Sequence, residues 1–298
     1  GYYTLTGGSM HVGGTTFVGK DGYGSFHQSG GHYSTQLLQV DTDGNGNFYL
    51  GGSGNIESER TVIGVNSIGS FHQTAGVHVI ERQLTLGEVE NRVGYYVMDG
   101  GSLSTLFGSN YFTDEGVNIG KSGTGVFVQN GGTHESRSYN LDIGKNSTGT
   151  GYYSLHGGLL NTFDTHIGLN GWGAFHQTGG TFVSISPTEL GANATGLGFY
   201  HLEGGLVQDY MLTIGKFGYG SYYQTGGTHT GATELGLFEG SIGIYHLAGG
   251  LFDPIRISIG TNGSATFIHE GGTMNAFDIF IGGAYLDNKP AGSGSYLL

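Results

Sequence analysis

The sequence predicts an all-β chain folded as a right-handed parallel β-solenoid, or β-helix, and three observations support this prediction. A phrase of the type GxFHQTGG recurs along the chain and alternates with a phrase of the type YYxLxGG. An aliphatic residue followed by glycine recurs after all but one of these phrases. Around both features, inward and outward positions alternate with a period of two, which is the period of a β-strand.

The paired glycines set the length of the repeat. The pairs, one of which is Ala-Gly, begin at residues 7, 30, 51, 75, 100, 131, 157, 179, 204, 226, 249 and 271. From 7 to 271 is 264 residues in eleven steps, or 24 residues per coil, and the two phrase types make the coils come in pairs. We therefore expect one domain over 1–298, with twelve coils and a terminal strand at 293–298. A coil of this kind buries its apolar side chains only against its neighbours, so the phrase must be repeated.

Stacked coils place equivalent residues about 4.8 Å apart along the axis. The aromatic residues of the phrases then form an inward ladder: Phe26, Phe71, Tyr96, Phe127, Tyr153, Phe175, Tyr200, Tyr222, Tyr245 and Phe267. The glutamines on the same face are expected to bond to the backbone or to each other, since an unpaired buried amide costs about 1–3 kcal/mol. Paired glycines form the corners, because glycine tolerates positive φ. Right-handedness follows from the usual chirality of parallel crossovers.

Other architectures fit less well. The chain shows no helical period and no capping box, which excludes helical repeats. The double unit of about 48 residues is long enough for a propeller blade, so a propeller stays open as an alternative. The net charge of −13 disfavours nucleic acid and anionic membranes as partners. No apolar run approaches the ~20 residues of a membrane span, so we expect no membrane insertion.

The alternating phrases GxFHQTGGT and GxYxLxGGxL, each followed by LxIG, resemble the strand repeats of bacterial autotransporter passengers and of large PEP-CTERM-associated surface proteins. The resemblance covers essentially the whole chain. It implies a β-solenoid at the bacterial cell surface or outside the cell, and it implies no shared catalytic residues.

The stretch DTDGNGNFY at 41–49 is similar to a calcium-binding loop. Positions 1, 3, 5 and 7 of such a loop fall on Asp41, Asp43, Asn45 and the backbone of Asn47, with Gly46 at the sharp turn. Position 12 is a glycine instead of the bidentate glutamate, so a Ca²⁺ site would need completion from a neighbouring coil. The alternative is a turn rich in Asp, Asn and Gly between two strands.

Two further columns contain side chains that are able to bind a metal ion or to act in acid–base catalysis. One follows the ladder aromatics and contains His27, His72, His176, His201 and His246. His176 and His201 lie on successive coils and could form a two-histidine metal pair. Because Val and Ser also occupy this column, surface histidines are the favoured interpretation.

The second column contains Asp142, His166 and Glu189, followed by Thr213 and Glu234. Asp142 and Glu189 would lie two coils apart, about 9–10 Å, near the separation of an inverting glycosidase pair. The column also holds Phe17 and Val62, so acids that keep the solenoid soluble are favoured. We expect no catalytic residue and no enzyme.

Surface aromatic residues precede the ladder aromatic in one coil type only: Tyr2, Tyr95, Tyr152 and Phe199. If the ladder faces inward, these rings face outward and could stack on sugar rings of surface glycans. If the faces are reversed, they belong to the core.

The two ends of the chain predict self-assembly. The chain opens on GYYTL and closes on GSYLL, so that Tyr296 falls on the position of Tyr3 and Leu298 on that of Leu5. Uncapped end coils would expose apolar ladders and unpaired strands. We therefore expect a structural extracellular protein that polymerises head to tail into a filament or matrix fibre. A carbohydrate-binding or polysaccharide-cleaving β-helix, and a piece of a longer surface adhesin, remain alternatives.

Overall fold

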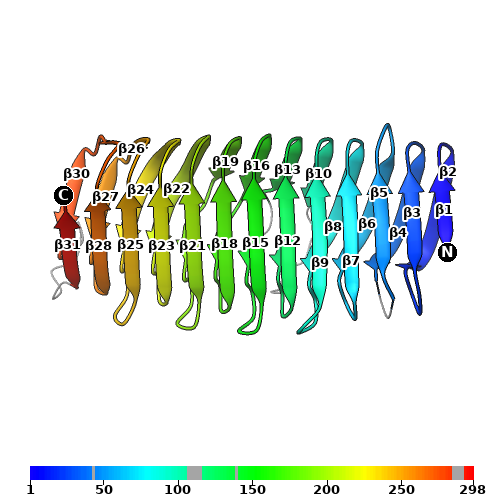
Figure 1. The fold of residues 1–298 in the computed structure, drawn as a ribbon, viewed down its shortest axis with the longest axis horizontal. Coiled ribbons are helices and arrows are strands. Elements are labelled where there is room, and N and C mark those ends of the chain that lie inside the picture. The colour runs from blue at the N-terminus through cyan, green and yellow to red at the C-terminus, as the bar shows by residue number, and fades with distance from the viewer. Residues whose placement is uncertain (42–43, 106–115, 138–139, 284–291) are drawn as a thin grey trace.

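The computed structural model describes residues 1–41, 44–105, 116–137, 140–283 and 292–298, and within these ranges the chain contains strands but no helix. The chain winds into successive coils stacked along one axis, with the two termini at opposite ends (Figure 1). Neighbouring strands of the described residues pair in parallel, for example β3 with β5 and β5 with β7. This confirms the solenoid and excludes the antiparallel blades of a propeller. In the described part of the chain, no helix is long and apolar enough to cross a membrane.

One strand of each coil contributes to a 13-stranded parallel sheet, which we call sheet A. Its strands are β1 (Tyr2–Leu5), β3 (Gly24–Gln28), β5 (Gly46–Leu50), β7 (Ile68–Gln73), β9 (Val93–Met98), β12 (Thr124–Gln129), β15 (Thr150–Leu155), β18 (Trp172–Gln177), β21 (Leu197–Leu202), β23 (Tyr219–Gln224), β25 (Ile242–Leu247), β28 (Ser264–His269) and β31 (Ser293–Leu297). These strands contain the recurring aromatic phrases.

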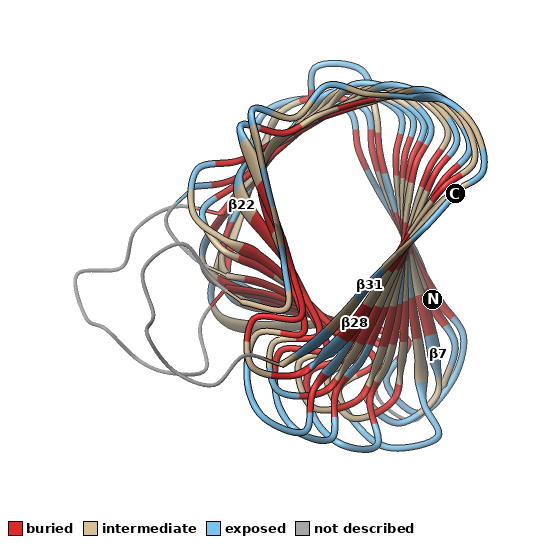
Figure 2. Cartoon of the chain, turned by 90° about the vertical axis from the view of Figure 1, so that its left-hand side faces the viewer, coloured by how far each residue is buried: buried red, intermediate tan, exposed pale blue. Residues whose placement is uncertain are grey.

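The rest of each coil contributes either one long strand or two short ones to sheet B, which curves around the opposite side of the core (Figure 2). The long strands are β2 (Ser9–Val18), β4 (His32–Val40), β6 (Asn55–Ile63), β8 (Val77–Leu86), β22 (Leu206–Ile214) and β24 (Thr228–Leu235). The short strands are β10 (Ser102–Thr105), β11 (Gly116–Ile119), β13 (Thr133–Ser136), β14 (Leu141–Ile143), β16 (Leu159–Thr162), β17 (Thr165–Ile167), β19 (Thr181–Ser184), β20 (Thr188–Leu190), β26 (Leu251–Asp253), β27 (Arg256–Ile259), β29 (Thr273–Met274) and β30 (Asp278–Ile281).

The predicted aromatic ladder lies in the core and runs the length of the solenoid. From Tyr3 to Tyr296, rings of successive coils stack with centroids 4.6 to 5.2 Å apart. Phe48 belongs to this ladder as well and is fully buried. The aliphatic residues that precede glycine, such as Ile143 and Ile167, form the second buried ladder. The ladder face of the strands is therefore the core face.

Glycine is required where one coil passes close to the next. Gly144, which follows the aliphatic ladder residue, has φ of 72°. A Cβ at this position would lie 2.2 Å from the carbonyl oxygen of Trp172 in the next coil. Any other residue at this corner would combine left-handed strain with a backbone clash.

A buried hydrogen-bond network explains why the two coil types alternate. In one example the Tyr153 hydroxyl donates to Gln129 Oε1 at 2.6 Å and lies 3.1 Å from His134 Nδ1. The Gln129 amide in turn donates to the backbone carbonyls of Gly132 and Leu159. The predicted bonds from glutamine to the backbone are thus confirmed. The tyrosine comes from the coil that follows its two partners, so the hydroxyl joins a pair of coils.

The same arrangement recurs at other coil pairs. The corresponding triplets are Gln73, His78 and Tyr96, and Gln224, His229 and Tyr245. Tyr200 bonds to Gln177 in the same way, but Phe182 stands at the histidine position. In the last pair His269 replaces the glutamine and contacts the Tyr296 hydroxyl at 2.8 Å.

Replacing His134 with phenylalanine is expected to reduce the sensitivity of the fold to acid. Burial lowers the pKa of His134 to about 3, and its Nε2 has no hydrogen-bond partner in the described chain. Since the unfolded pKa is about 6.5, this histidine costs stability as the pH falls below that value, roughly 2–3 kcal/mol near pH 4.5. The His134→Phe variant, which copies Phe182 two coils further on, should lose that slope in urea unfolding. An unchanged pH dependence would contradict the neutral buried imidazole.

Candidate functional site

The outer face of sheet A carries the predicted surface aromatics. Tyr2, Tyr95, Tyr152 and Phe199 occupy one outward column, separated by smaller or polar residues of intervening coils. Tyr2 is 70% exposed, Tyr95 and Tyr152 are about 40% exposed, and Phe199 is half-buried. The sequence allowed these rings to face either outward or into the core, and the structure shows that they face outward.

Four rings of this face form a continuous strip that we call the aromatic strip. Tyr152 contacts Trp172 with ring centroids 4.7 Å apart, Trp172 contacts Phe199 at 5.6 Å, and Phe199 contacts Tyr219 at 5.7 Å. Trp172 and Tyr219 were missed by the sequence analysis. Each lies two residues before the outward column on its own strand, so the period of two placed both on the same face. Tyr2 and Tyr95 lie in other coils, outside this strip.

The histidine column runs beside the strip and is partly exposed, as predicted. The imidazole of His201 stacks between His176 and Tyr223, with centroids 5.2 and 5.0 Å away. Tyr223 then stacks on His246 at 4.8 Å. Nearer the N-terminus, His27 stacks on Tyr49 at 4.4 Å. The stacked rings on the outer face of sheet A are therefore separated by about the same distances as the ladder rings in the core.

Acidic residues of the neighbouring corner pair with several of these histidines. His72 Nε2 lies 2.6 Å from Asp99, His176 Nε2 2.9 Å from Glu203, and His246 Nε2 2.8 Å from Glu270. In each case the acid comes from the coil after the histidine. Hydrogen bonds from Asn130 and His72 hold the pKa of Asp99 below its usual range.

The residues of the predicted calcium loop separate into different environments. Asp41 is fully buried at φ of 78°, and its carboxylate accepts hydrogen bonds from the backbone N–H groups of Val65 and Ser67 in the next coil. The amide oxygen of Asn45 accepts from the Ser67 hydroxyl. Asn47 faces outward on β5 and accepts from Ser70. Asp43 lies outside the described residues, and Ca²⁺ binding stays a prediction.

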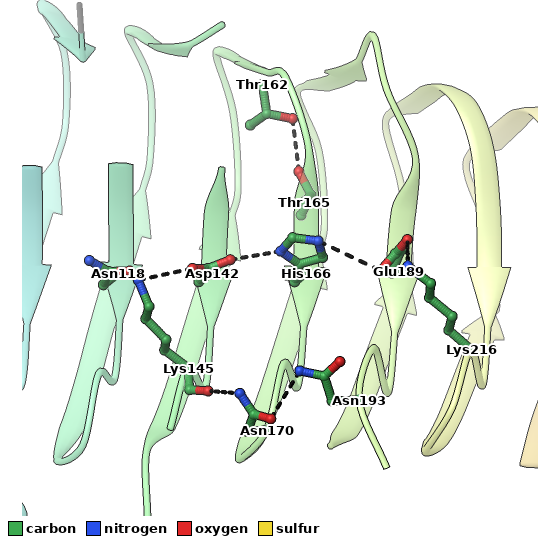
Figure 3. Close-up of polar contacts among 10 residues, drawn as sticks. All are labelled: Asn118, Asp142, Lys145, Thr162, Thr165, His166, Asn170, Glu189, Asn193 and Lys216. Atoms are coloured by element: carbon green, nitrogen blue, oxygen red, sulfur yellow. Dashed lines mark hydrogen bonds and ion pairs between the residues drawn. The ribbon is translucent and has the colours of Figure 1, made fainter. Parts of the chain in front are cut away.

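A buried polar row replaces the solvent-exposed acids that we expected on sheet B (Figure 3). Asn118, Asp142, His166 and Glu189 occupy adjacent strands in register. Asp142 is 4% exposed and Glu189 is 8% exposed, so the interpretation as solubilising surface charges is wrong. The lysine of the following corner folds over the row, which the linear sequence does not reveal.

The charges of this row alternate in sign. His166 Nδ1 lies 2.7 Å from Asp142, and its Nε2 lies 3.6 Å from Glu189. Lys145 closes one end, 3.4 Å from Asp142 and 2.8 Å from Asn118 Oδ1, and Lys216 closes the other, 2.6 Å from Glu189. The imidazole fills the space between the two carboxylates. This places the His166 side chain where a glycosidase pair would hold its substrate.

The environment of His166 favours its charged form. Burial opposes protonation, but the hydrogen bond to Asp142 and the charges of Asp142, Glu189 and Asp164 outweigh it and raise the pKa of His166. The folded state therefore binds this proton more tightly than the unfolded chain does.

The predicted assembly residues lie at the two ends of the solenoid. Tyr3 is 45% exposed and pairs with Phe26, while Leu5 is buried. Tyr296 pairs with Phe267 in the same ladder position. Leu298 lies just beyond β31 and is 97% exposed.

Replacing His166 with threonine, the residue at the same place on β22, should destabilise the protein in a pH-dependent way. The stabilisation from charged His166 is fully present below about pH 6.5 and is lost as the pH rises through the raised folded pKa. We expect a loss of about 1–3 kcal/mol near pH 6 that shrinks near pH 9, measured by urea unfolding. A loss that is equal at both pH values would show that the imidazole contributes only as a neutral group.

Comparison of the chain with protein-family models, with curated proteins and with solved structures found no match.

Proposed function

We propose that this chain is a structural component of a bacterial cell surface or extracellular matrix, in which solenoids join head to tail into a filament. The observation that carries the proposal is the contrast between inner and end coils. Ladder residues of the inner coils, such as Phe71 and Phe127, are fully buried, whereas Tyr3 remains 45% exposed. Stacking another coil on this face would bury it as every inner ladder ring is buried.

The shape of the first coil supports the same conclusion. A hollow of about 370 Å³ opens beside it, and its lining includes Tyr3, Phe17, Val18 and Phe26. At the other end, Phe277, Ile281 and Leu298 are more than half exposed. Both ends thus offer apolar groups and strand edges to a further coil of the same geometry. Because the two faces differ, their contact is heterologous and extends without closing.

The C-terminal face is stepped, which sets a condition on the joint. Sheet A ends with β31, whereas sheet B ends with β30 of the preceding coil. The first strand of an added subunit would take the place that β31 already occupies. Continuous pairing in both sheets therefore requires that β31 yield to the incoming β1, a local strand exchange between subunits.

The resemblance to autotransporter and PEP-CTERM-associated repeats supports the cell-surface assignment, and the net charge of −13 is compatible with it. No catalytic role is proposed, because the best candidate acids are held in the buried polar row.

Tyr3→Lys is expected to block assembly, and Tyr2→Lys is its matched control. Both residues lie on β1, but Tyr3 lies in the ladder and Tyr2 points outward. Stacking would bury an unpaired ammonium at position 3, which costs several kcal/mol, whereas position 2 would stay in water. Electron microscopy and sedimentation at increasing protein concentration should show filaments for the parent and for Tyr2→Lys only.

Two outcomes contradict this assembly. A parent protein that stays a monomer at high concentration removes the head-to-tail joint. A native chain with many more than 298 residues would instead supply further coils covalently.

Glycan binding by the aromatic strip is a second candidate, favoured by the continuous contacts from Tyr152 to Tyr219. Planar partly exposed rings along a rigid sheet suit stacking against sugar rings. The neighbouring coils supply small residues at the same places, since Thr150 is in register with Trp172 and Ala174 with Tyr152.

Trp172→Thr and Tyr152→Ala are expected to weaken oligosaccharide binding while the fold is kept. Each ring contributes about 1 kcal/mol, which corresponds to roughly fivefold in affinity. Binding is measured on an oligosaccharide array and then by calorimetry, with Tyr210→Ser as the control, because Tyr210 is exposed on sheet B. Absence of binding by the parent, or equal binding by all variants, would refute this role.

A further inference from the structure

Three side chains with metal-binding atoms converge on the outer face of sheet A. His176 lies on β18, His201 lies on the neighbouring β21, and Glu203 follows β21 at the corner. His176 Nε2 is 2.9 Å and His201 Nδ1 is 3.4 Å from the same oxygen, Glu203 Oε1. One ligand atom from each residue lies within 4.8 Å of the other two.

This group differs from the other histidine–acid pairs on the same face. His72 with Asp99 and His246 with Glu270 each join one imidazole to one carboxylate. In the described part of the chain, only the group at Glu203 brings three candidate ligands together. A second imidazole is not needed for an ion pair, but it adds the second nitrogen that a metal site uses.

Neighbouring residues hold the ligands in place. The ring of His201 is stacked between His176 and Tyr223, and its Nε2 lies 3.4 Å from Thr225 Oγ1. Its Nδ1 is thereby left directed at Glu203. Engagement of one ring nitrogen by a hydrogen-bond partner is typical of metal-bound histidine.

We propose that His176, His201 and Glu203 bind one divalent transition-metal ion of the Zn²⁺ class. Two imidazole nitrogens and one carboxylate oxygen match the preferences of Zn²⁺, and Cu²⁺ and Ni²⁺ accept similar ligands. The three side chains are 36 to 44% exposed, so they can move closer to reach metal bonds of about 2.0–2.2 Å. The exposed side leaves a coordination position for water or for a ligand from outside the chain.

The solenoid supplies substitutions that preserve the fold, because adjacent coils place other residues at the same positions. His176→Ser copies Ser154 in the preceding coil, and His201→Tyr copies Tyr223 in the following one. Glu203→Thr copies Thr225, which follows β23 at the same position one coil later. His72→Val copies Val97 and serves as a control at a histidine with a single acid partner.

The test titrates Zn²⁺ into untagged, chelator-treated protein by calorimetry and titrates Co²⁺ with visible absorption as a second readout. We expect one Zn²⁺ per chain, a rise in Tm on binding, and Co²⁺ bands of a low-symmetry site. Each of the three ligand variants should lose at least about tenfold in affinity, and His72→Val should bind as the parent does. No binding by the folded parent, or equal affinity in the ligand variants, would overturn the proposal. Circular dichroism of each variant separates loss of the site from loss of the fold.

Discussion

The parallel hydrogen-bonded spacing between coils is the constraint on which the whole structure depends. It places equivalent residues at nearly the same point in successive layers, so a side chain must pack against the residue one coil before and one coil after. An aromatic ring suits this arrangement because flat rings stack at this distance, and the observed centroid separations of 4.6 to 5.2 Å match it. The glycine corners follow from the same spacing, because a Cβ at Gly144 would meet the backbone of the next coil.

Polar groups in the same columns must satisfy a stricter condition, since like charges stacked at the strand spacing repel one another. The buried row on sheet B meets it by placing the His166 imidazole between Asp142 and Glu189, with lysines at both ends. The outer face of sheet A meets it with stacked histidines whose acidic partners come from the next corner. Replacing a buried ion pair by apolar residues is often neutral for stability, so the row is better understood as specifying the register of the coils than as a large source of stability.

Much of the fold could be predicted from the sequence because equivalent positions in successive coils have the same environment and therefore carry similar residues many times over. The positions of the aromatic and aliphatic ladders and of the corners follow from period two and period 24, and so does the placement of Tyr152 on the face opposite the ladder, although the sequence did not decide which face is the core. The candidate sites were less predictable, because they depend on single departures from the repeat. Trp172 lies where the adjacent coils have threonine and leucine. The repeat pattern does not predict that its ring contacts both Tyr152 and Phe199. The ion pair between Lys145 and the buried Asp142 likewise depends on side-chain conformation in three dimensions, which the repeat does not specify.

The alternation of two coil types follows from the needs of a buried hydroxyl. A ladder made only of phenylalanine would need no polar partner, but a buried tyrosine hydroxyl calls for one. Tyr96, Tyr153, Tyr200 and Tyr245 each have it, whereas Tyr222 follows a coil with Leu202 in place of the glutamine, and its hydroxyl has no hydrogen-bond partner among the described residues. Where the hydroxyl is paired, the glutamine of the preceding coil accepts it and anchors its own amide to two backbone carbonyls, as Gln129 does for Tyr153. Where phenylalanine follows the glutamine, as Phe48 follows Gln28, the glutamine oxygen has no hydrogen-bond partner among the described residues, and a shift of the chain by one coil would create more such places. The inner face therefore specifies the register in steps of two coils, which frees the outer columns to vary.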